Sequence, residues 1–353
     1  MQLADLPSPR VSVVICNHNY AQYIQQALHS VFAQTRPAHE LIVVDDGSTD
    51  ESVAVMQPLL ARPGCKLVQQ DNGGQTSAYN TGFAHTTGDV VLFLDADDAL
   101  LPNALEEVSL RFTAGVAKVH FRLRLMGSDG KSQPVIIPTK LDQGEVAQAF
   151  LSRGVPHASP PASGNAYRRE VLQRLFPLPF DPVDRHGADF FCVYGSALYG
   201  RVAACEQPLG LYRVHAQQPV VGQTPSFSFG NAAKALQQAE RQKKRLARMK
   251  AWLAQREPGK FELPERWREF AIEKSAFAGA ALGAGAGPIR RSKAWRLAPQ
   301  VLDAIWAPRT DALLRKLGLT AWVLLLLVAP YPLALRAAHY VCDPGSRHSV
   351  MRP

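Results

Sequence analysis

The chain has 353 residues, 46% of them hydrophobic, which is enough for about two domains with packed cores. The net charge of +9 is unevenly placed, because residues 1–230 carry 17 Lys and Arg against 21 Asp and Glu, whereas residues 231–316 carry 19 against 8. This basic block lacks interleaved aromatic residues and any zinc or RNA-binding motif, so we expect no nucleic-acid partner. The five cysteines form no C-x-x-C pair and no signal peptide is recognisable, which predicts a protein of the reducing cytosol without disulfides or a zinc site.

Three continuous apolar runs in the first 100 residues indicate strands that are buried on both faces of a parallel sheet. They span residues 11–16, 40–44 and 90–94, and apolar positions at helical spacing predict a helix over residues 23–34. The resulting β-α-β crossover is right-handed, which puts the carboxyl ends of both strands on one edge of the sheet. Ligands of open α/β sheets bind outside those ends.

Carboxylates follow two of these strands. Asp95, Asp97 and Asp98 come directly after residues 90–94 and repel one another, so a positive partner is needed. A hard divalent cation that keeps some waters and bridges to a phosphate meets that need. The alternative is a solvated acidic turn that caps the next helix. Asp45 and Asp46 end the preceding strand, and carboxylates from both strands can converge on one crevice that suits a nucleoside diphosphate with a leaving group.

Five blocks of sequence resemble the amino-terminal half of family-2 glycosyltransferases of the GT-A fold in order, spacing and residue types. They are residues 11–19, 30–35, 40–50, 72–82 and 87–98. The resemblance implies an α/β fold in which a Rossmann-like, mostly parallel sheet is flanked by helices. It also implies an inverting transferase that uses a nucleotide sugar and a divalent metal, Mg²⁺ or Mn²⁺.

The resemblance further implies which residues form the donor site. Asp46 would bond the base, Cys16 and Asn17 would line the same pocket through backbone atoms, and Asp45 would shape the turn. Asp95 would reach the ribose. The base preference stays open, since an Asp at position 46 suits uridine but also tolerates other pyrimidines and guanine.

Asp97 would bind the metal on the diphosphate. The other donor-site residues that the resemblance implies are Asn19, Gln75, Asn80 and Ala96. One position departs from the family, because Tyr79 stands where many relatives carry Arg. If that Arg contacts phosphate, its charge must come from elsewhere in this chain, and Arg213 is the residue we expect to supply it.

A second acidic segment predicts the catalytic base. Residues 186–191 resemble the family's Gly-x-(Glu/Asp)-Asp motif, with Ala188 where an acid is common, so the resemblance assigns the base to Asp189. An inverting transfer needs one carboxylate to take the proton of the acceptor hydroxyl. Asp181 and Asp184 are rivals for this role. Asp189 can also cap the apolar helix that follows, because an N-terminal helix position favours a negative charge.

Residues 211–215 resemble a Tyr-Arg-x-His motif in which the His or Arg closes over the diphosphate. The resemblance therefore implies that His215 joins the metal, while a lone His is otherwise a surface or core residue. Upstream, residues 119–125 alternate apolar and polar side chains, which predicts a half-exposed strand. Its His120 and two Arg residues form a solvated face or a contact with an acidic acceptor, and residues 135–137 are the expected hairpin partner.

The last third of the chain is predicted to be helical and basic. Helices are expected over residues 231–255 and 265–281, and residues 317–335 contain no charge. Such a segment is close to the length that spans a bilayer. Pro330 and Pro332 weaken a straight helix and leave room for a re-entrant or interfacial segment, and a buried core helix is the alternative. Neighbouring basic residues favour anionic lipid. The expected domains are a catalytic domain over 1–225, a basic helical region over 226–316 and a membrane-associating segment over 317–353.

These features together predict an inverting, metal-dependent glycosyltransferase at the cytosolic face of the cell membrane, in bacteria the inner membrane. Its acceptor is expected to be a lipid-linked or surface-polysaccharide intermediate. A transferase acting on a polyprenyl phosphate is one alternative, and a non-catalytic scaffold that binds nucleotide sugars is another, because of Ala188 and Tyr79. A processive synthase is not expected, since residues 263–267 carry Leu in place of the Gln of the Gln-x-x-Arg-Trp motif.

Overall fold

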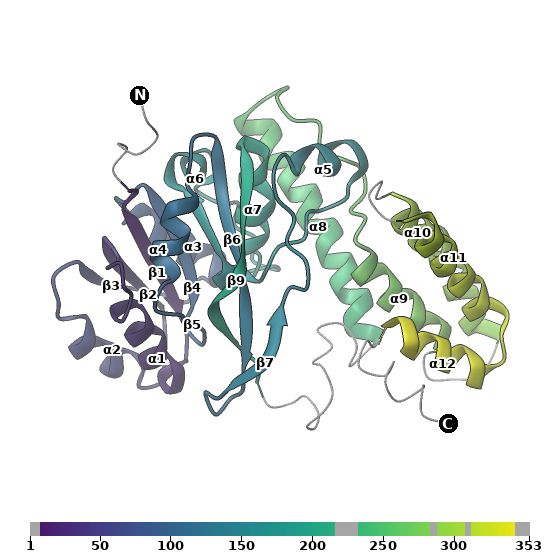
Figure 1. Ribbon diagram of the computed structural model, residues 1–353, viewed down its shortest axis with the longest axis horizontal. Helices are drawn as coiled ribbons and strands as arrows, with labels where there is room; N and C mark the ends of the chain where they lie inside the picture. Colours follow the sequence, from purple (N-terminus) through teal and green to yellow (C-terminus); the bar gives the residue numbers. More distant parts are fainter. Residues whose placement is uncertain (1–7, 216–231, 283–287, 308–311, 343–353) are drawn as a thin grey trace. The chain divides into compact units, whose positions relative to one another are not determined.

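Residues 8–215, 232–282, 288–307 and 312–342 are described by the computed structural model (Figure 1). The chain divides into two compact units. The first comprises Met1–Ala147 and His157–Ala216, and the second comprises Gln148–Pro156 and Gln217–Pro353. The residues predicted to bind the donor and to act as base all belong to the first unit.

The first unit is built around one mixed β-sheet. Its described strands are β1 (Val11–Asn17), β2 (Glu40–Asp46), β3 (Cys65–Gln70), β4 (Val90–Asp95), β5 (Ala99–Leu100), β6 (Val116–Met126), β7 (Ser132–Ile137), β8 (Asn165–Arg168) and β9 (Arg201–Arg213). They follow the order β3-β2-β1-β4-β8-β6-β9-β5, and β7 pairs with β6. Strands β1 to β4 are mutually parallel, whereas β8 runs antiparallel to both of its neighbours.

Helices cover the sheet of this unit (Figure 1). They are α1 (Ala21–Phe32), α2 (Ser52–Leu60), α3 (Gln75–Ala84), α4 (Ala104–Arg111), α6 (Arg169–Leu175) and α7 (Ala188–Ser196), with short 3₁₀ turns at Ala162–Gly164 and Ala197–Tyr199. The expected α/β architecture with flanking helices is therefore confirmed.

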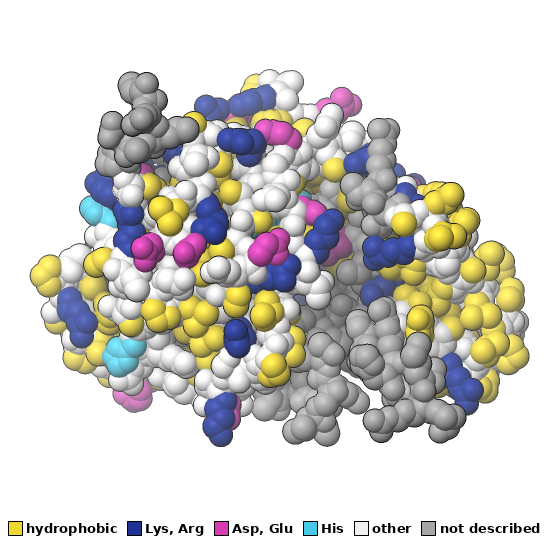
Figure 2. Space-filling model, in the orientation of Figure 1, with side chains coloured by type: hydrophobic (Ala, Val, Ile, Leu, Met, Phe, Trp, Pro, Cys, Tyr) yellow, Lys and Arg dark blue, Asp and Glu magenta, His cyan; other side chains and the backbone are white. Residues whose placement is uncertain are grey.

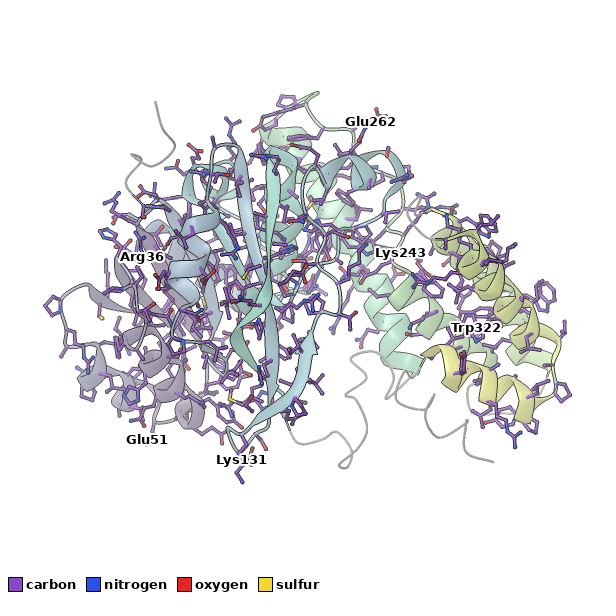
Figure 3. All side chains as sticks on the ribbon, in the orientation of Figure 1. Arg36, Glu51, Lys131, Lys243, Glu262 and Trp322 are labelled. Atoms are coloured by element: carbon purple, nitrogen blue, oxygen red, sulfur yellow. The ribbon has the colours of Figure 1, made fainter. Side chains whose placement is uncertain are left out.

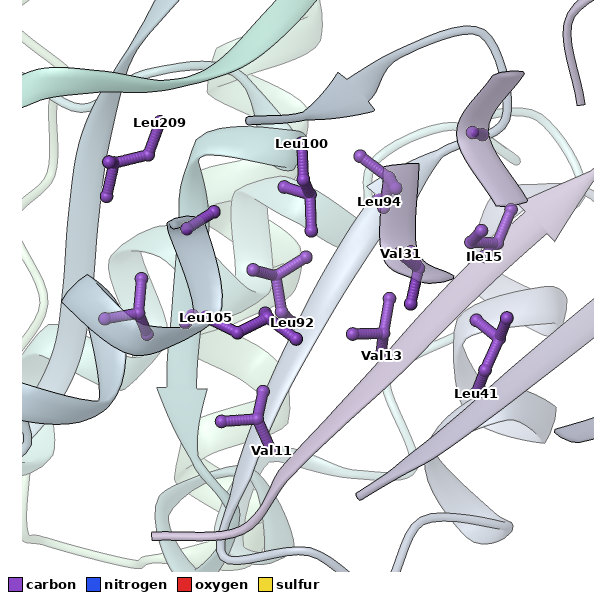
Figure 4. Packing of buried hydrophobic residues seen from close by; sticks show 14 of the residues in the cluster. Val11, Val13, Ile15, Val31, Leu41, Leu92, Leu94, Leu100, Leu105 and Leu209 are labelled. Atoms are coloured by element: carbon purple, nitrogen blue, oxygen red, sulfur yellow. The ribbon is translucent and has the colours of Figure 1, made fainter. Parts of the chain in front are cut away.

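Strands β1 and β4 are buried because the side chains on both of their faces are apolar. Val13, Ile15, Leu92 and Leu94 are 1% exposed or less, and they pack in one cluster with the apolar side of α1 (Figure 4). Each such side chain stabilises the fold by about 1.5–3 kcal/mol relative to its exposed state. The cluster thereby holds the carboxyl ends of these strands in a defined place.

The strand register brings the predicted polar residues to one edge. β1 lies between β2 and β4, with Asn17 opposite Asp45 and Cys16 opposite Asp95. Because all three strands run parallel, the residues that follow them emerge on the same side. The prediction that carboxylates from these strands converge on one edge is confirmed.

The predicted half-exposed strand is confirmed at Arg122 and Arg124, which are partly exposed, and is wrong at His120. β6 lies inside the sheet between β8 and β9, and its Lys118 and His120 are fully buried. The alternating pattern misled because these polar side chains are satisfied by neighbours inside the protein instead of by water. The hairpin partner is confirmed, since β7 pairs antiparallel with β6.

The second unit is helical where it is described. Its helices are α5 (Ala147–Arg153), α8 (Ala232–Arg256), α9 (Phe270–Leu282), α10 (Pro288–Trp306), α11 (Leu313–Val328) and α12 (Tyr331–Cys342). Phe277, Val301, Trp322 and Val323 form part of its apolar core, and Trp322 lies among these helices in Figure 3. The predicted helices over 231–255 and 265–281 correspond to α8 and α9.

The apolar segment 317–335 is divided between two helices. α11 ends at Val328, and α12 begins after Ala329 and Pro330. Proline lacks a backbone N–H and breaks a helix interior, which accounts for the division at Pro330. Within the described ranges, none of the helices combines the length and the apolarity that crossing a membrane requires.

Candidate active site

The turn after β4 carries the three clustered carboxylates. Asp98 is 1% exposed, and its two oxygens accept hydrogen bonds from the Ser163 hydroxyl at 2.6 Å and the Arg213 backbone N–H at 2.8 Å. Burial and the charges of Asp95 and Asp97 raise the pKa of Asp98 well above its ordinary value. Asp98 thus fastens the turn to two distant segments.

Asp95 lies against two other carboxylates. Burial raises its pKa to about 7, and the charges of Asp97 and Asp189 add to the effect. The Ser163 hydroxyl also accepts a hydrogen bond from the Asp95 backbone N–H at 3.1 Å. The repulsion among the three carboxylates that the sequence predicts is therefore relieved in part, because the raised pKa favours the protonated acid. Ala96, which lies between Asp95 and Asp97, is buried.

Asp97 and His215, the two residues that the sequence predicts as metal ligands, contact each other. The His215 Nε2 atom lies 2.7 Å from Oδ2 of Asp97, with the Asp97 side chain 16% exposed and that of His215 46% exposed. The carboxylate suits Mn²⁺ or Mg²⁺ when phosphate oxygens and water complete the shell, and the imidazole nitrogen favours Mn²⁺ because Mg²⁺ prefers oxygen ligands. In the part of the chain that the structure describes, no group of three or more His, Cys, Asp or Glu is arranged to hold a metal. The donor's diphosphate would have to supply further ligands.

Arg213 supports the acidic turn from inside the protein. Its side chain is buried, and its guanidinium lies over the Tyr23 ring at 4.3 Å from the centroid. It donates hydrogen bonds to the backbone oxygens of Asp97 (2.8 Å), Gly127 (3.0 Å) and Ser128 (3.2 Å), and to Oε1 of Gln26. This arrangement assigns Arg213 to the support of the turn, whereas the sequence predicted a contact with the diphosphate.

Asp46 ends β2 beneath a glycine loop. It is 3% exposed and accepts hydrogen bonds from the backbone N–H groups of Gly73 (2.8 Å) and Gly74 (2.7 Å) and from Nε2 of Gln70 (2.7 Å). Gly74 has a φ of 81°, a conformation that favours glycine. A carboxylate offers about four acceptor positions, so Asp46 retains about one for a ligand.

Neighbouring residues shape the loops beside Asp46. Asp45 accepts hydrogen bonds from Nδ2 of Asn17 at 2.9 Å and from the hydroxyl of Ser48 at 2.6 Å, which agrees with the predicted turn-shaping role. Oδ1 of Asn19 accepts from the Thr49 backbone N–H at 2.7 Å. These contacts join the loops that follow β1 and β2.

Three other predicted donor-site residues lie on the edges of this region. Gln75 is the first residue of α3, and Cys16 lies in β1 opposite Asp95. The Asn80 amide is bonded to the backbone of Leu178 at both ends, at 3.1 Å and 2.7 Å. Their contacts with a donor stay predictions.

Asp189 is the second residue of α7, and its Oδ1 accepts a hydrogen bond from the Phe190 backbone N–H at 2.8 Å. Its charge contributes to the raised pKa of Asp95, which places the two acids around a common space. The rival Asp181 is engaged in its own turn, where its Oδ1 accepts from the Val183 backbone N–H at 2.8 Å. The structure therefore brings Asp189 into electrostatic contact with the acidic turn.

Sequence reasoning missed Arg185, which joins the glycine loop to the Asp189 segment. Its guanidinium donates to the backbone oxygen of Gly73 at 3.2 Å and to both oxygens of Asn72. Its own carbonyl accepts from the Thr76 backbone N–H at 3.2 Å. The only signal was its position four residues before Asp189, which does not reveal backbone partners.

Tyr79, the departure from the family pattern, is a core residue. Its ring stacks on Phe93 with centroids 4.1 Å apart, and its side chain is 2% exposed. Burial, followed by the charge of Asp95, raises the pKa of its hydroxyl well above the ordinary value. At the position where the family pattern has an Arg, this chain therefore has an aromatic ring that packs against β4.

A buried polar network holds the segment before Ser163. Lys118 lies with its Nζ 2.9 Å from Nε2 of His157 and donates to the hydroxyl of Ser159 at 3.0 Å, which in turn donates to Oδ1 of Asn165 at 3.0 Å. The Asn165 amide donates to the backbone oxygens of residues 160–162. Burial lowers the pKa of both Lys118 and His157, so the network favours uncharged forms. It was not predicted, because its members lie far apart in the sequence.

The chain is similar to several known proteins. Residues 12–176 match the model of the family described as glycosyl transferase family 2. An uncharacterized glycosyltransferase of Nostoc sp. (strain PCC 7120) is 40% identical over 212 residues, which cover 58% of this chain and 65% of the relative. An undecaprenyl-phosphate 4-deoxy-4-formamido-L-arabinose transferase of Sodalis glossinidius is 39% identical over 105 residues, or 28% of this chain and 31% of the relative. The chain thus spans less than two thirds of the length of either relative.

A solved structure shares the fold. The crystal structure of residues 1–349 of S. aureus TarS superimposes with a TM-score of 0.52 and 15% sequence identity, covering 97% of this chain and 92% of that one. At this identity the likeness concerns the fold alone.

Proposed function

We propose that the chain is a glycosyl transferase of family 2, whose family model residues 12–176 match, and that it transfers a sugar, with inversion, from a nucleoside diphosphate sugar to a hydroxyl acceptor. The observation that carries the proposal is the convergence of Asp95, Asp97 and Asp189 from the end of β4 and the start of α7. A metal-side carboxylate and a separate base are what such a transfer requires.

The pocket at Asp46 favours uracil or thymine as the base. Three protein donors already occupy its carboxylate, which leaves about one acceptor position. Uracil and thymine each present one N–H donor at N3, whereas guanine presents two adjacent donors that would need two acceptors. We therefore infer a donor with a uracil or thymine base, and a UDP-sugar is the first candidate.

Asp189 acts as the general base. Its carboxylate takes the proton of the acceptor hydroxyl while that oxygen forms a bond to C1 of the sugar, and the bond from C1 to the diphosphate oxygen breaks on the opposite side. The electron pair of that bond leaves with the nucleoside diphosphate. Asp97 and His215 would hold a divalent cation, which would supply positive charge to this leaving group when bound.

The acceptor is inferred to be a lipid-linked or polysaccharide intermediate at the cytosolic face of a membrane. The name of the Sodalis relative includes an undecaprenyl phosphate, and a succinoglycan biosynthesis protein of Rhizobium meliloti is 28% identical over 210 residues, or 57% of this chain and 60% of the relative. The Sodalis relative favours a second candidate function, in which the transferase acts on the phosphate of a polyprenyl lipid as its acceptor.

The decisive experiment compares thermal stability with UDP, GDP, CDP and dTDP, each with and without Mn²⁺. A ligand that binds only the folded state stabilises it by about 2.7 kcal/mol at 100 times its dissociation constant. We expect the largest shift with UDP and Mn²⁺, and release of UDP from a matching UDP-sugar that depends on Asp189. No shift with any nucleotide would exclude the donor site, and binding with no turnover on any UDP-sugar and acceptor would favour a scaffold.

A further inference from the structure

Helix α11 is apolar on two opposite sides. Trp322, Val323, Leu326 and Leu327 are 5% exposed or less and pack into the core of the helical unit. The outer side is also apolar, with exposed fractions of 62% at Leu313, 83% at Leu314, 49% at Leu317, 53% at Leu324 and 66% at Val328. A helix on the surface of a soluble unit ordinarily shows polar residues there.

The exposed residues form one continuous stripe. At 3.6 residues per turn, Leu313, Leu314, Leu317, Leu324 and Val328 fall within an arc of about 100°. The charges of this helix lie outside the arc, because Arg315 projects about 100° beyond Leu314 and Lys316 is buried. Figure 2 shows hydrophobic side chains gathered over α10 and α11. Contiguous exposed apolar surface of this kind marks an interaction site.

Exposed aromatic and basic side chains lie on α10, the helix that precedes α11. Trp295 and Trp306 of α10 are 54% and 45% exposed, and Trp is enriched where proteins meet the interface of a bilayer. Exposed Lys293 and Arg296 lie beside Trp295 in the sequence. Residues 288–342 contain eight Lys or Arg against two Asp, a net charge of +6, and one of these acids, Asp303, is paired with Arg268 at 2.6 Å.

We propose that the outer side of α11 docks in the plane of an anionic lipid bilayer. An amphipathic helix that lies in the interface buries its apolar side among the acyl chains while nearby basic residues contact acidic head groups. A second copy of the chain is a poorer occupant, since a symmetric contact would bring two surfaces of the same positive charge together. Docking at this surface would bring the protein to the membrane that carries a lipid-linked acceptor. The biological role of the docking rests on the proposed function.

Vesicle flotation of the full chain tests the proposal. The probes are vesicles of phosphatidylcholine alone and of phosphatidylcholine with phosphatidylglycerol at about 3:1. We expect binding to the anionic vesicles, at least tenfold weaker for Leu314→Glu/Val328→Glu and weakened by Lys293→Gln/Arg296→Gln. The matched control is Ala251→Glu/Ala254→Glu, which adds the same two charges at exposed positions of α8 and is expected to bind within about threefold of the wild type.

Two results would overturn the docking. One is no binding of the wild type to anionic vesicles, and the other is equal loss in the α8 control. Sedimentation velocity measures whether the chain forms a dimer. A dimer that Leu314→Glu/Val328→Glu abolishes would assign the stripe to contact with a second copy. The UDP-dependent thermal shift is measured on every variant, so that vesicle binding without any nucleotide response would reject the proposed function while leaving the docking intact.

Discussion

Nε2 of His215 lies 2.7 Å from Oδ2 of Asp97 across a sequence separation of 118 residues. The contact joins the end of β9 to the turn after β4, and the Tyr23 ring packs 5.4 Å from the imidazole. Both groups therefore face one position at the protein surface, where a cation can contact a carboxylate and an imidazole together.

Replacing either member of this pair should separate nucleotide binding from its metal dependence. We expect Asp97→Asn to abolish the gain in UDP affinity that Mn²⁺ provides and His215→Gln to reduce it about tenfold, as measured by titration calorimetry. Asp89→Asn is the control, because Asp89 is a surface carboxylate paired with Arg10. An unchanged metal dependence in Asp97→Asn would remove that residue from the metal site.

The base can be identified by isosteric substitution. Asp189→Asn removes the proton acceptor without changing the size of the side chain, so kcat should fall by about 10²–10⁴ while UDP affinity stays within about threefold. Asp184→Asn is the matched control and should retain turnover. If Asp184→Asn were the inactive variant and Asp189→Asn the active one, the assignment of the base would be reversed.

The raised pKa of Asp95, about 7, predicts a pH-dependent stability without ligands. Between about pH 4 and pH 7 the folded protein holds a proton that the unfolded chain has lost, so its stability falls as pH rises through this window. Asp95→Asn removes this loss. We expect the variant to exceed the wild type at pH 8 by on the order of 4 kcal/mol, since the pKa differs by about three units and each unit contributes about 1.4 kcal/mol, and to match it near pH 4. Urea unfolding at both pH values measures this, and a pH-independent difference would contradict the prediction.

Arg213→Lys should destabilise the first unit by about 2–4 kcal/mol, because an ammonium group cannot reproduce the hydrogen bonds of the buried guanidinium. The measurement is the midpoint of the thermal transition that UDP shifts. Arg201→Lys is the control, since Arg201 is exposed. A midpoint equal to that of the control would show that Arg213 contributes little to holding the turn.

The elements of the first unit were predictable where a local pattern determines them. β1, β2 and β4 follow from continuous apolar runs, and their parallel pairing makes the polar residues meet. The burial of Lys118 in β6 was not predictable, because its partners His157 and Ser159 lie about 40 residues away. A polar residue in an alternating strand indicates water unless such distant partners are known.

The same limit applies to the site. Asp97 and Asp189 were predicted from motifs, whereas the position of Arg213 was not, because its partners are mostly backbone oxygens that any residue supplies. In the second unit, the uncharged segment 317–335 indicated membrane association without showing which side of α11 is covered by the core. That distinction requires the packing of Trp322 and its neighbours.

The bonds of Arg185 to the loop of Asn72 and Gly73 have a kinetic consequence. Arg185 links the loop that holds Asp46 to the segment that leads to Asp189. A nucleobase that displaces the loop therefore also displaces the carboxylate that accepts the proton. Discrimination between donor nucleotides should then be larger in turnover than in binding. Arg185→Ala would let the two segments adjust separately, so that discrimination in turnover would exceed discrimination in binding by less. The ratio of kcat values for UDP- and GDP-sugars would then approach the ratio of their affinities.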